Sequence, residues 1–111
     1  MSTNSSITVK TSDNKYLSIY CHWDGYLSGV GATLIEHYYE QSLVEGLIGL
    51  GDISTLGACI KSTEAYGRDK GEDGSTEAWM YETYEDVLEC NNREFNYLWD
   101  GTQWLCNNEE F

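Results

Sequence analysis

The chain has 111 residues, of which 41% are hydrophobic, so it is long and apolar enough to form one folded domain over residues 1–111. Nineteen acidic and six basic residues give a net charge of −13. Nucleic acids and anionic lipids are bound through lysine and arginine, so this charge argues against direct contact with DNA, RNA or a membrane surface. An acidic surface can instead serve solubility, bind a basic protein or imitate a polyanion.

Residues 1–6 are polar and uncharged, and no segment approaches the roughly 18 apolar residues of a membrane helix. We therefore expect residues 1–6 to be flexible and the protein to carry no secretion signal. The four cysteines are far apart, which argues against a zinc site and favours reduced thiols in a cytoplasm. They are Cys21, Cys59, Cys90 and Cys106.

The N-terminal half predicts a β-hairpin followed by two short helices. Residues 7–11 alternate between apolar and polar, and after a polar turn the alternation resumes over residues 16–23, with Trp23 in the core. A helical spacing then predicts a first helix with Val30, Leu34, Ile35 and Tyr38 on its buried face. Ser42 and Glu45 have the spacing of a capping box that begins a second helix, which ends at Gly49.

In the C-terminal half we expect a turn over 52–57, a third strand over 58–63 and an exposed loop over 66–75. A strand over 77–83 should lead into one or two helical turns over 84–88. Asp100-Gly101 predicts a two-residue hairpin turn that pairs Trp99 with Thr102. One face of this hairpin is aromatic and must be covered, through Phe95, Tyr97, Trp99 and Trp104.

These elements together predict an α+β fold. An antiparallel sheet, built from the N-terminal hairpin and the C-terminal hairpin, should pack against the central helix pair.

The negative charge is concentrated in the second half of the chain. Residues 1–50 hold five acids and two bases, a net charge of −3, whereas residues 51–111 hold fourteen acids and four bases, a net charge of −10. Strands and helices over 77–89 would hold the acidic side chains of this segment in a fixed row. Repulsion within such a row destabilises the fold, which favours a function for the row. We therefore expect a partner-binding role, although solubility alone remains the alternative, for Glu72, Asp73, Glu77, Glu82, Glu85, Asp86 and Glu89.

The densest group of reactive side chains lies in the segment 20–26. Cys21 and His22 are neighbours on a strand and point to opposite faces, so they cannot form a nucleophile–base pair. A metal or acid–base site on His22 and Asp24 needs a third group that the sequence does not identify. The segment 29–31 precedes a helix but lacks the basic residues of a phosphate-binding loop. We expect no enzymatic activity, no cofactor and no metal.

Several motifs resemble those of a family of small phage and prophage proteins. They are Ser18-Ile-Tyr-Cys-His-Trp-Asp-Gly-Tyr26, Val30-Gly31, Leu34–Tyr38, the Gly51–Gly57 turn and Gly67-Arg-Asp-Lys-Gly-Glu72. The resemblance covers residues 16–104 and departs from the family at Leu27, where proline is common, and at Lys70, where arginine is common. It implies expression in the cytoplasm of a bacterial host and assigns no catalytic residues.

The first functional hypothesis is a phage-encoded inhibitor that binds the basic surface of a host nuclease or CRISPR effector and imitates DNA. It would act as a monomer or a small homo-oligomer. The alternative is a small-ligand or nucleotide-signal binding protein with Tyr20, His22, Trp23 and Arg68 around a pocket, in which case Arg68 is more than part of a mixed-charge loop. A phage accessory protein with no enzymatic activity is the third possibility.

Overall fold

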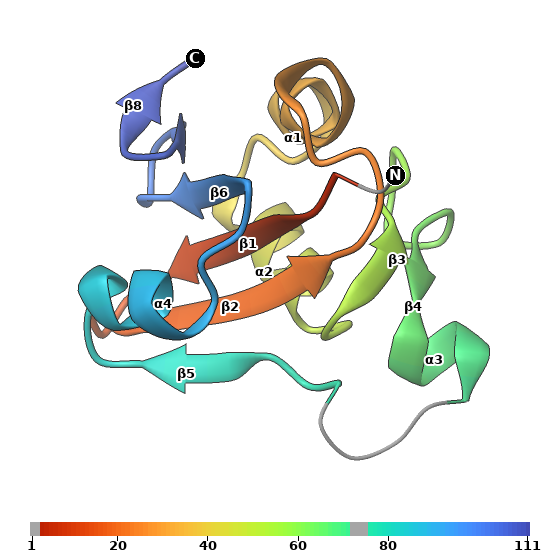
Figure 1. The fold of residues 1–111 in the computed structure, drawn as a ribbon, viewed down its shortest axis with the longest axis horizontal. Helices are drawn as coiled ribbons and strands as arrows, with labels where there is room; N and C mark the ends of the chain where they lie inside the picture. The colour runs from red at the N-terminus through yellow and green to blue at the C-terminus, as the bar shows by residue number, and fades with distance from the viewer. Residues whose placement is uncertain (1–2, 72–75) are drawn as a thin grey trace.

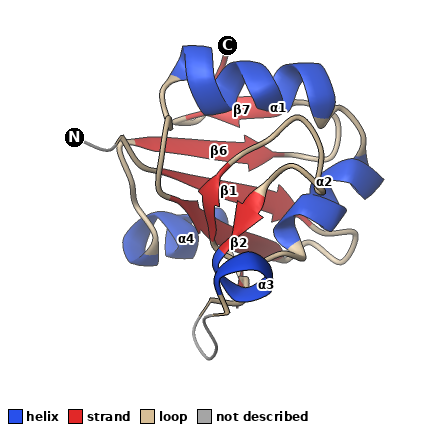
Figure 2. Ribbon diagram, turned by 90° about the vertical axis from the view of Figure 1, so that its right-hand side faces the viewer, coloured by secondary structure: helices blue, strands red, loops and turns tan. Residues whose placement is uncertain are grey.

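A mixed eight-stranded sheet with helices on both of its faces forms the fold in the computed structural model, which describes residues 3–71 and 76–111 (Figures 1 and 2). The α+β class predicted from the sequence is confirmed. The strands are β1 (Ser5–Lys10), β2 (Tyr16–Cys21), β3 (Ile53–Thr55), β4 (Glu64–Ala65), β5 (Trp79–Tyr81), β6 (Phe95–Trp99), β7 (Trp104–Cys106) and β8 (Glu109–Glu110). The helical segments are a wide π-type turn η1 (Leu27–Gly31), α1 (Ala32–His37), α2 (Gln41–Ile48), α3 (Tyr66–Lys70) and α4 (Tyr84–Cys90).

The N-terminal hairpin is confirmed, and its first strand lies in the middle of the sheet. β1 pairs antiparallel with β2, which places Ile7 opposite Ile19, and it pairs parallel with β6 on its other edge. β3 is also parallel to β2. The expectation of a purely antiparallel sheet is therefore wrong, because β5 and α4 carry the chain across to the far side of β1 before β6 begins.

The expected flexibility of residues 1–6 is wrong at Ser5 and Ser6, which are fully buried in β1. β1 lies between β2 and β6, so both of its edges are covered. The Ser6 hydroxyl donates to Oδ1 of Asn96, on β6, at 2.8 Å. Residues 1–2 lie outside the described part of the chain.

The main core lies between the sheet and the helices η1, α1 and α2. Val30, Leu34 and Tyr38 are buried there, as the helical spacing predicts. Ile35 is 46% exposed, because the short helix α1 buries only a narrow stripe. Trp23 is 43% exposed instead of entering the core, because β2 ends at Cys21 and the strand alternation ends with it.

The second predicted helix exists as α2 and ends before Gly49, but the predicted capping box does not form. α2 begins at Gln41, one residue before Ser42, and no side chain caps its first turn. Glu45 Oε2 instead accepts a hydrogen bond at 2.8 Å from Gln41 Nε2. The carboxylate is therefore held by the residue that begins the helix and does not turn back to Ser42.

The C-terminal hairpin forms with a register two residues away from the prediction. Trp99 lies opposite Trp104 and Tyr97 opposite Cys106, across a loop of four residues. Asp100 causes the wider loop, because its Oδ1 accepts from the backbone N–H groups of Thr102 and Gln103 at 2.9 Å each. A shift of two residues keeps the same side chains on each face. On the aromatic face, Tyr97, Trp99 and Trp104 are therefore buried, as predicted, and Phe95 is partly buried.

The strand predicted over 58–63 is wrong, and the short strand β3 lies earlier, at Ile53–Thr55. Side-chain hydroxyls fold the later segment into a turn: Thr63 Oγ1 donates to the Cys59 carbonyl at 2.9 Å and accepts from the Gly57 N–H at 2.9 Å. Within the predicted loop 66–75, residues 66–70 form α3, and 72–75 lie outside the described residues. The predicted strand and helix further on are confirmed as β5 and α4.

Candidate functional site

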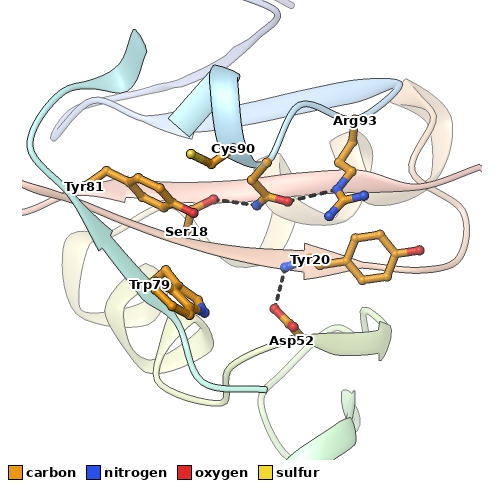
Figure 3. Close-up of a pocket in the computed structure, with 8 residues that line it drawn as sticks. Ser18, Tyr20, Asp52, Trp79, Tyr81, Cys90 and Arg93 are labelled. Atoms are coloured by element: carbon orange, nitrogen blue, oxygen red, sulfur yellow. Dashed lines mark hydrogen bonds between the residues drawn. The ribbon is translucent and has the colours of Figure 1, made fainter. Parts of the chain in front are cut away.

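The edge of β2 changes its partner halfway along, and a cleft lies at this point. β5 pairs with β2 over Tyr16–Ser18, whereas β3 pairs with it only at Cys21. In between, the backbone N–H of Tyr20 donates to Asp52 Oδ1 at 2.9 Å. The cleft has a volume of about 410 Å³ (Figure 3). It is lined by Ser18, Tyr20, Asp52, Trp79, Tyr81, Cys90, Asn91 and Arg93.

Asn91, the residue that follows α4, holds the inner wall of the cleft together. Its Nδ2 donates to Ser18 Oγ at 2.9 Å and to the Ile19 carbonyl at 3.2 Å, and its Oδ1 accepts from Arg93 Nε at 2.9 Å. Ser18 Oγ also accepts from the Thr8 hydroxyl at 2.9 Å. Asn91 is 8% exposed, so this wall is a fixed polar network whose amide atoms are occupied.

Arg93 brings a positive charge into the cleft. Its Cζ lies 4.5 Å from the centre of the Tyr20 ring, and the hydrogen bond from Nε to Asn91 fixes the plane of the guanidinium group. Within the described part of the chain, the two terminal nitrogens of Arg93 make no hydrogen bond or ion pair. A charged group that is oriented by its neighbours can therefore donate to a bound anion.

Asp52 supplies a negative charge at another side of the cleft. Burial raises the pKa of its carboxyl group, while the Tyr20 N–H and the Arg93 charge act in the opposite direction. Its backbone is fixed by a hydrogen bond from the Asp52 N–H to the Thr76 carbonyl at 2.6 Å. This close approach requires the positive φ of +79° at Gly51, where any side chain would collide with Thr76. Only Oδ1 of Asp52 has a hydrogen-bond partner among the described residues.

β5 contributes an aromatic wall. Trp79 and Tyr81 are two residues apart on this strand and therefore project from the same face, toward the cleft. Trp79 is 63% exposed, and its neighbour Met80, on the opposite face of the strand, is 62% exposed. Burial raises the pKa of the Tyr81 hydroxyl, so it is a neutral donor at physiological pH.

The described acidic residues that the sequence singled out lie on α4 or next to an end of β5. α4 buries Val87 and turns Glu85 and Glu89, one helical turn apart, to solvent. Lys15 forms an ion pair with Glu82. We call the described members of this group the acidic surface: Glu77, Glu82, Glu85, Asp86 and Glu89. The other two predicted members, Glu72 and Asp73, lie outside the described residues.

Of the four residues predicted to surround a pocket, only Tyr20 lines the cleft. His22 Nδ1 is 2.7 Å from the Tyr20 hydroxyl, and the exposed Trp23 lies edge-on to the His22 ring. Arg68 pairs with Asp69 at 2.8 Å and donates to the carbonyls of Ile60 and Thr63. These contacts stabilise the turn that precedes α3, and they leave Arg68 outside the cleft.

Sequence reasoning missed most of the cleft, because Asp52 lies far along the chain from Asn91 and Arg93. One signal was present: Arg93 is the only basic residue between positions 72 and 94, where eight residues are acidic.

Across residues 3–71 and 76–111, no group of three or more histidine, cysteine, aspartate or glutamate side chains is arranged to hold a metal ion. No helix in the same part of the chain is long and apolar enough to cross a membrane. Comparison with protein-family models, with curated proteins and with solved structures finds no match to this chain.

Proposed function

We propose that this protein is a phage-encoded, non-enzymatic inhibitor that acts in the cytoplasm of a bacterial host. It binds the basic surface of a nucleic-acid-handling or defence protein, such as a nuclease or a CRISPR effector, through the acidic surface. The observation that carries this proposal is an exposed tryptophan, Trp79, on the same ordered segment as a group of solvent-exposed carboxylates.

The carboxylates of α4 are held in place by the fold. Val87 is fully buried beneath the helix, and the Thr83 hydroxyl accepts from the Asp86 N–H at 3.1 Å, which caps its first turn. Among the described residues, Lys15 is the only cation paired with a member of the acidic surface. The remaining charges can therefore occupy a lysine- and arginine-lined groove that otherwise holds phosphate groups.

Trp79 gives the acidic surface an apolar anchor. Tryptophan is enriched among the residues that dominate binding energy at protein interfaces, and a side chain that is 63% exposed still has most of its area to bury. Charge alone would attract any basic protein. The ring adds selectivity, because the partner must offer an apolar recess within its basic groove.

The test compares two variants with equal charge. In the first, Glu77, Glu85 and Glu89 are replaced by lysine; in the second, Glu36, Glu40 and Glu45, which are exposed around α1 and α2, are replaced by lysine. Each triple substitution changes the net charge from −13 to −7. Purified wild-type and variant proteins are used as baits in a bacterial lysate at low and high salt, and bound proteins are then eluted with duplex DNA.

We expect the wild type and the control triple variant to retain the same DNA-elutable protein at low salt and to lose it at high salt. The acidic-surface variant should bind that protein at least roughly tenfold more weakly, and the purified partner should lose nuclease or DNA-binding activity only with the wild type or the control. Equal retention by both triple variants, or retention that duplex DNA does not displace, would refute the proposal.

A further inference from the structure

We propose that the cleft between β3, β5 and the end of α4 binds a small aromatic zwitterion of the amino-acid class. Arg93 binds its carboxylate, Asp52 binds its ammonium group, and its ring packs against Trp79 and Tyr81. Figure 3 shows these four side chains around the cleft. The two ionic contacts, through Arg93 and Asp52, use none of the carboxylates of the acidic surface, and Trp79 is the residue that the two proposals share.

The carboxylate site follows from the orientation of Arg93. Its Nε is bonded to Asn91, and the Tyr20 ring covers one face of its guanidinium group. Both terminal nitrogens remain without a partner in the described part of the chain. A planar fork with two open donors matches the two oxygens of a carboxylate.

The ammonium site follows from Asp52. One carboxylate oxygen is used by the Tyr20 N–H at 2.9 Å, and the other has no partner among the described residues. Asp52 and Arg93 line the same cleft but are not within the 4.0 Å of an ion pair. Opposite charges held apart in one cleft leave each available to a ligand that carries both signs.

The charge of the whole protein also favours a zwitterion. A net charge of −13 repels a free anion. A nucleotide would bring two or more negative charges to a site with one arginine. A molecule with no net charge avoids this repulsion and can still form both ionic contacts.

The ring position follows from β5. Trp79 and Tyr81 project from one face of the strand and line the cleft together. Rings that stack or meet edge to face are stabilised beyond the burial of their area, so an aromatic ligand is preferred over an aliphatic one. The volume of about 410 Å³ is sufficient for a bicyclic side chain with its amino-acid group.

The experiment separates the two ionic contacts by removing each charge from the ligand. Isothermal titration calorimetry is performed with L-tryptophan, with tryptamine, which lacks the carboxylate, and with indole-3-propionate, which lacks the ammonium group. We expect the wild type to bind L-tryptophan roughly tenfold or more tightly than either analogue, since hydrogen bonds to charged groups are the stronger class. Guanosine monophosphate is titrated as the competing ligand class.

Two variants assign each contact to its residue. Arg93→Gln should bind L-tryptophan and tryptamine equally, and Asp52→Asn should bind L-tryptophan and indole-3-propionate equally. Asparagine retains an oxygen for the Tyr20 N–H, so Asp52→Asn keeps the backbone contact. Lys70→Gln, which removes an exposed charge outside the cleft, is the matched control and should bind as the wild type does.

Absence of saturable L-tryptophan binding by the wild type would overturn the proposal, whatever the variants do. Tighter binding of guanosine monophosphate would overturn the ligand class, and unchanged ligand ranking in folded Arg93→Gln and Asp52→Asn would overturn the residue assignment. The variant with lysine at positions 77, 85 and 89 should still bind L-tryptophan. Failure of the inhibitor function is therefore distinguishable from failure of this one.

Discussion

Asn91 joins the sheet to the cleft, and its replacement by alanine gives a test of the architecture. Asn91→Ala removes two neutral hydrogen bonds, to Ser18 and to the Ile19 carbonyl, and one bond from the charged Arg93. Neutral bonds contribute ~1 kcal/mol each and bonds to charged groups ~1.5 kcal/mol or more. Water reaches Arg93 and replaces part of its bond, so we expect a total loss of ~3 kcal/mol in the free energy of unfolding.

For a domain of this length, a loss of that size lowers the melting temperature by about 12 °C. Urea unfolding followed by circular dichroism measures the free energy directly. Asn92→Ala is the graded control, because this exposed neighbour accepts only one bond, from Asn96 Nδ2 at 3.0 Å, and should cost ~1 kcal/mol or less. A loss below ~1 kcal/mol for Asn91→Ala would mean that the network does not hold the sheet and the cleft together.

Two further predictions rest on ionisable groups. Burial raises the pKa of Asp52, so the folded protein keeps this proton to a higher pH than the unfolded chain, and stability falls as pH rises through the raised pKa. Asp52→Asn has no such ionisation, so the difference in free energy of unfolding between this variant and the wild type, measured in urea, should shift in favour of the variant from acidic to neutral pH. The same pH dependence in both proteins would contradict the reasoning. The Ser62 hydroxyl lowers the pKa of exposed Cys59, whereas burial raises that of Cys21 to about 12. Mass spectrometry should find iodoacetamide on Cys59 first and slower labelling in Ser62→Ala; earlier labelling of Cys21 would be the opposite result.

Local patterns predicted most of the elements because each apolar period determines which face of its segment is buried. Alternation placed Ile7 and Ile19 in the core, and the hairpin aromatics Tyr97 and Trp99 were assigned to the correct face. The register error in that hairpin did not change the face, since the shift was by two residues. Local spacing was therefore sufficient wherever one face is apolar and the other polar.

Long-range pairing was beyond the reach of such patterns. The parallel contact of β1 with β6 joins segments about 90 residues apart, and nothing in either segment specifies the direction of its partner. The same limit hid the cleft, whose charged groups, Asp52 and Arg93, come from two sides of the β2 edge. The turn closed by the Thr63 hydroxyl was wrongly predicted as a strand, because threonine has a high β propensity.

The short helix α4 relates the two proposed sites to each other. Its outer face carries Glu85 and Glu89 of the acidic surface, whereas its C-terminal end positions Asn91 and, through it, Arg93. Because the carboxylates of the acidic surface and the charged groups of the cleft are different residues, substitutions at either set test one site while Trp79, which both sites use, is left in place. Both sites nevertheless depend on how α4 packs on the sheet. Val87, the one fully buried residue of this helix, fixes that packing. Exposed acidic residues are therefore placed on α4, the same helix whose end positions Asn91 in the buried polar network.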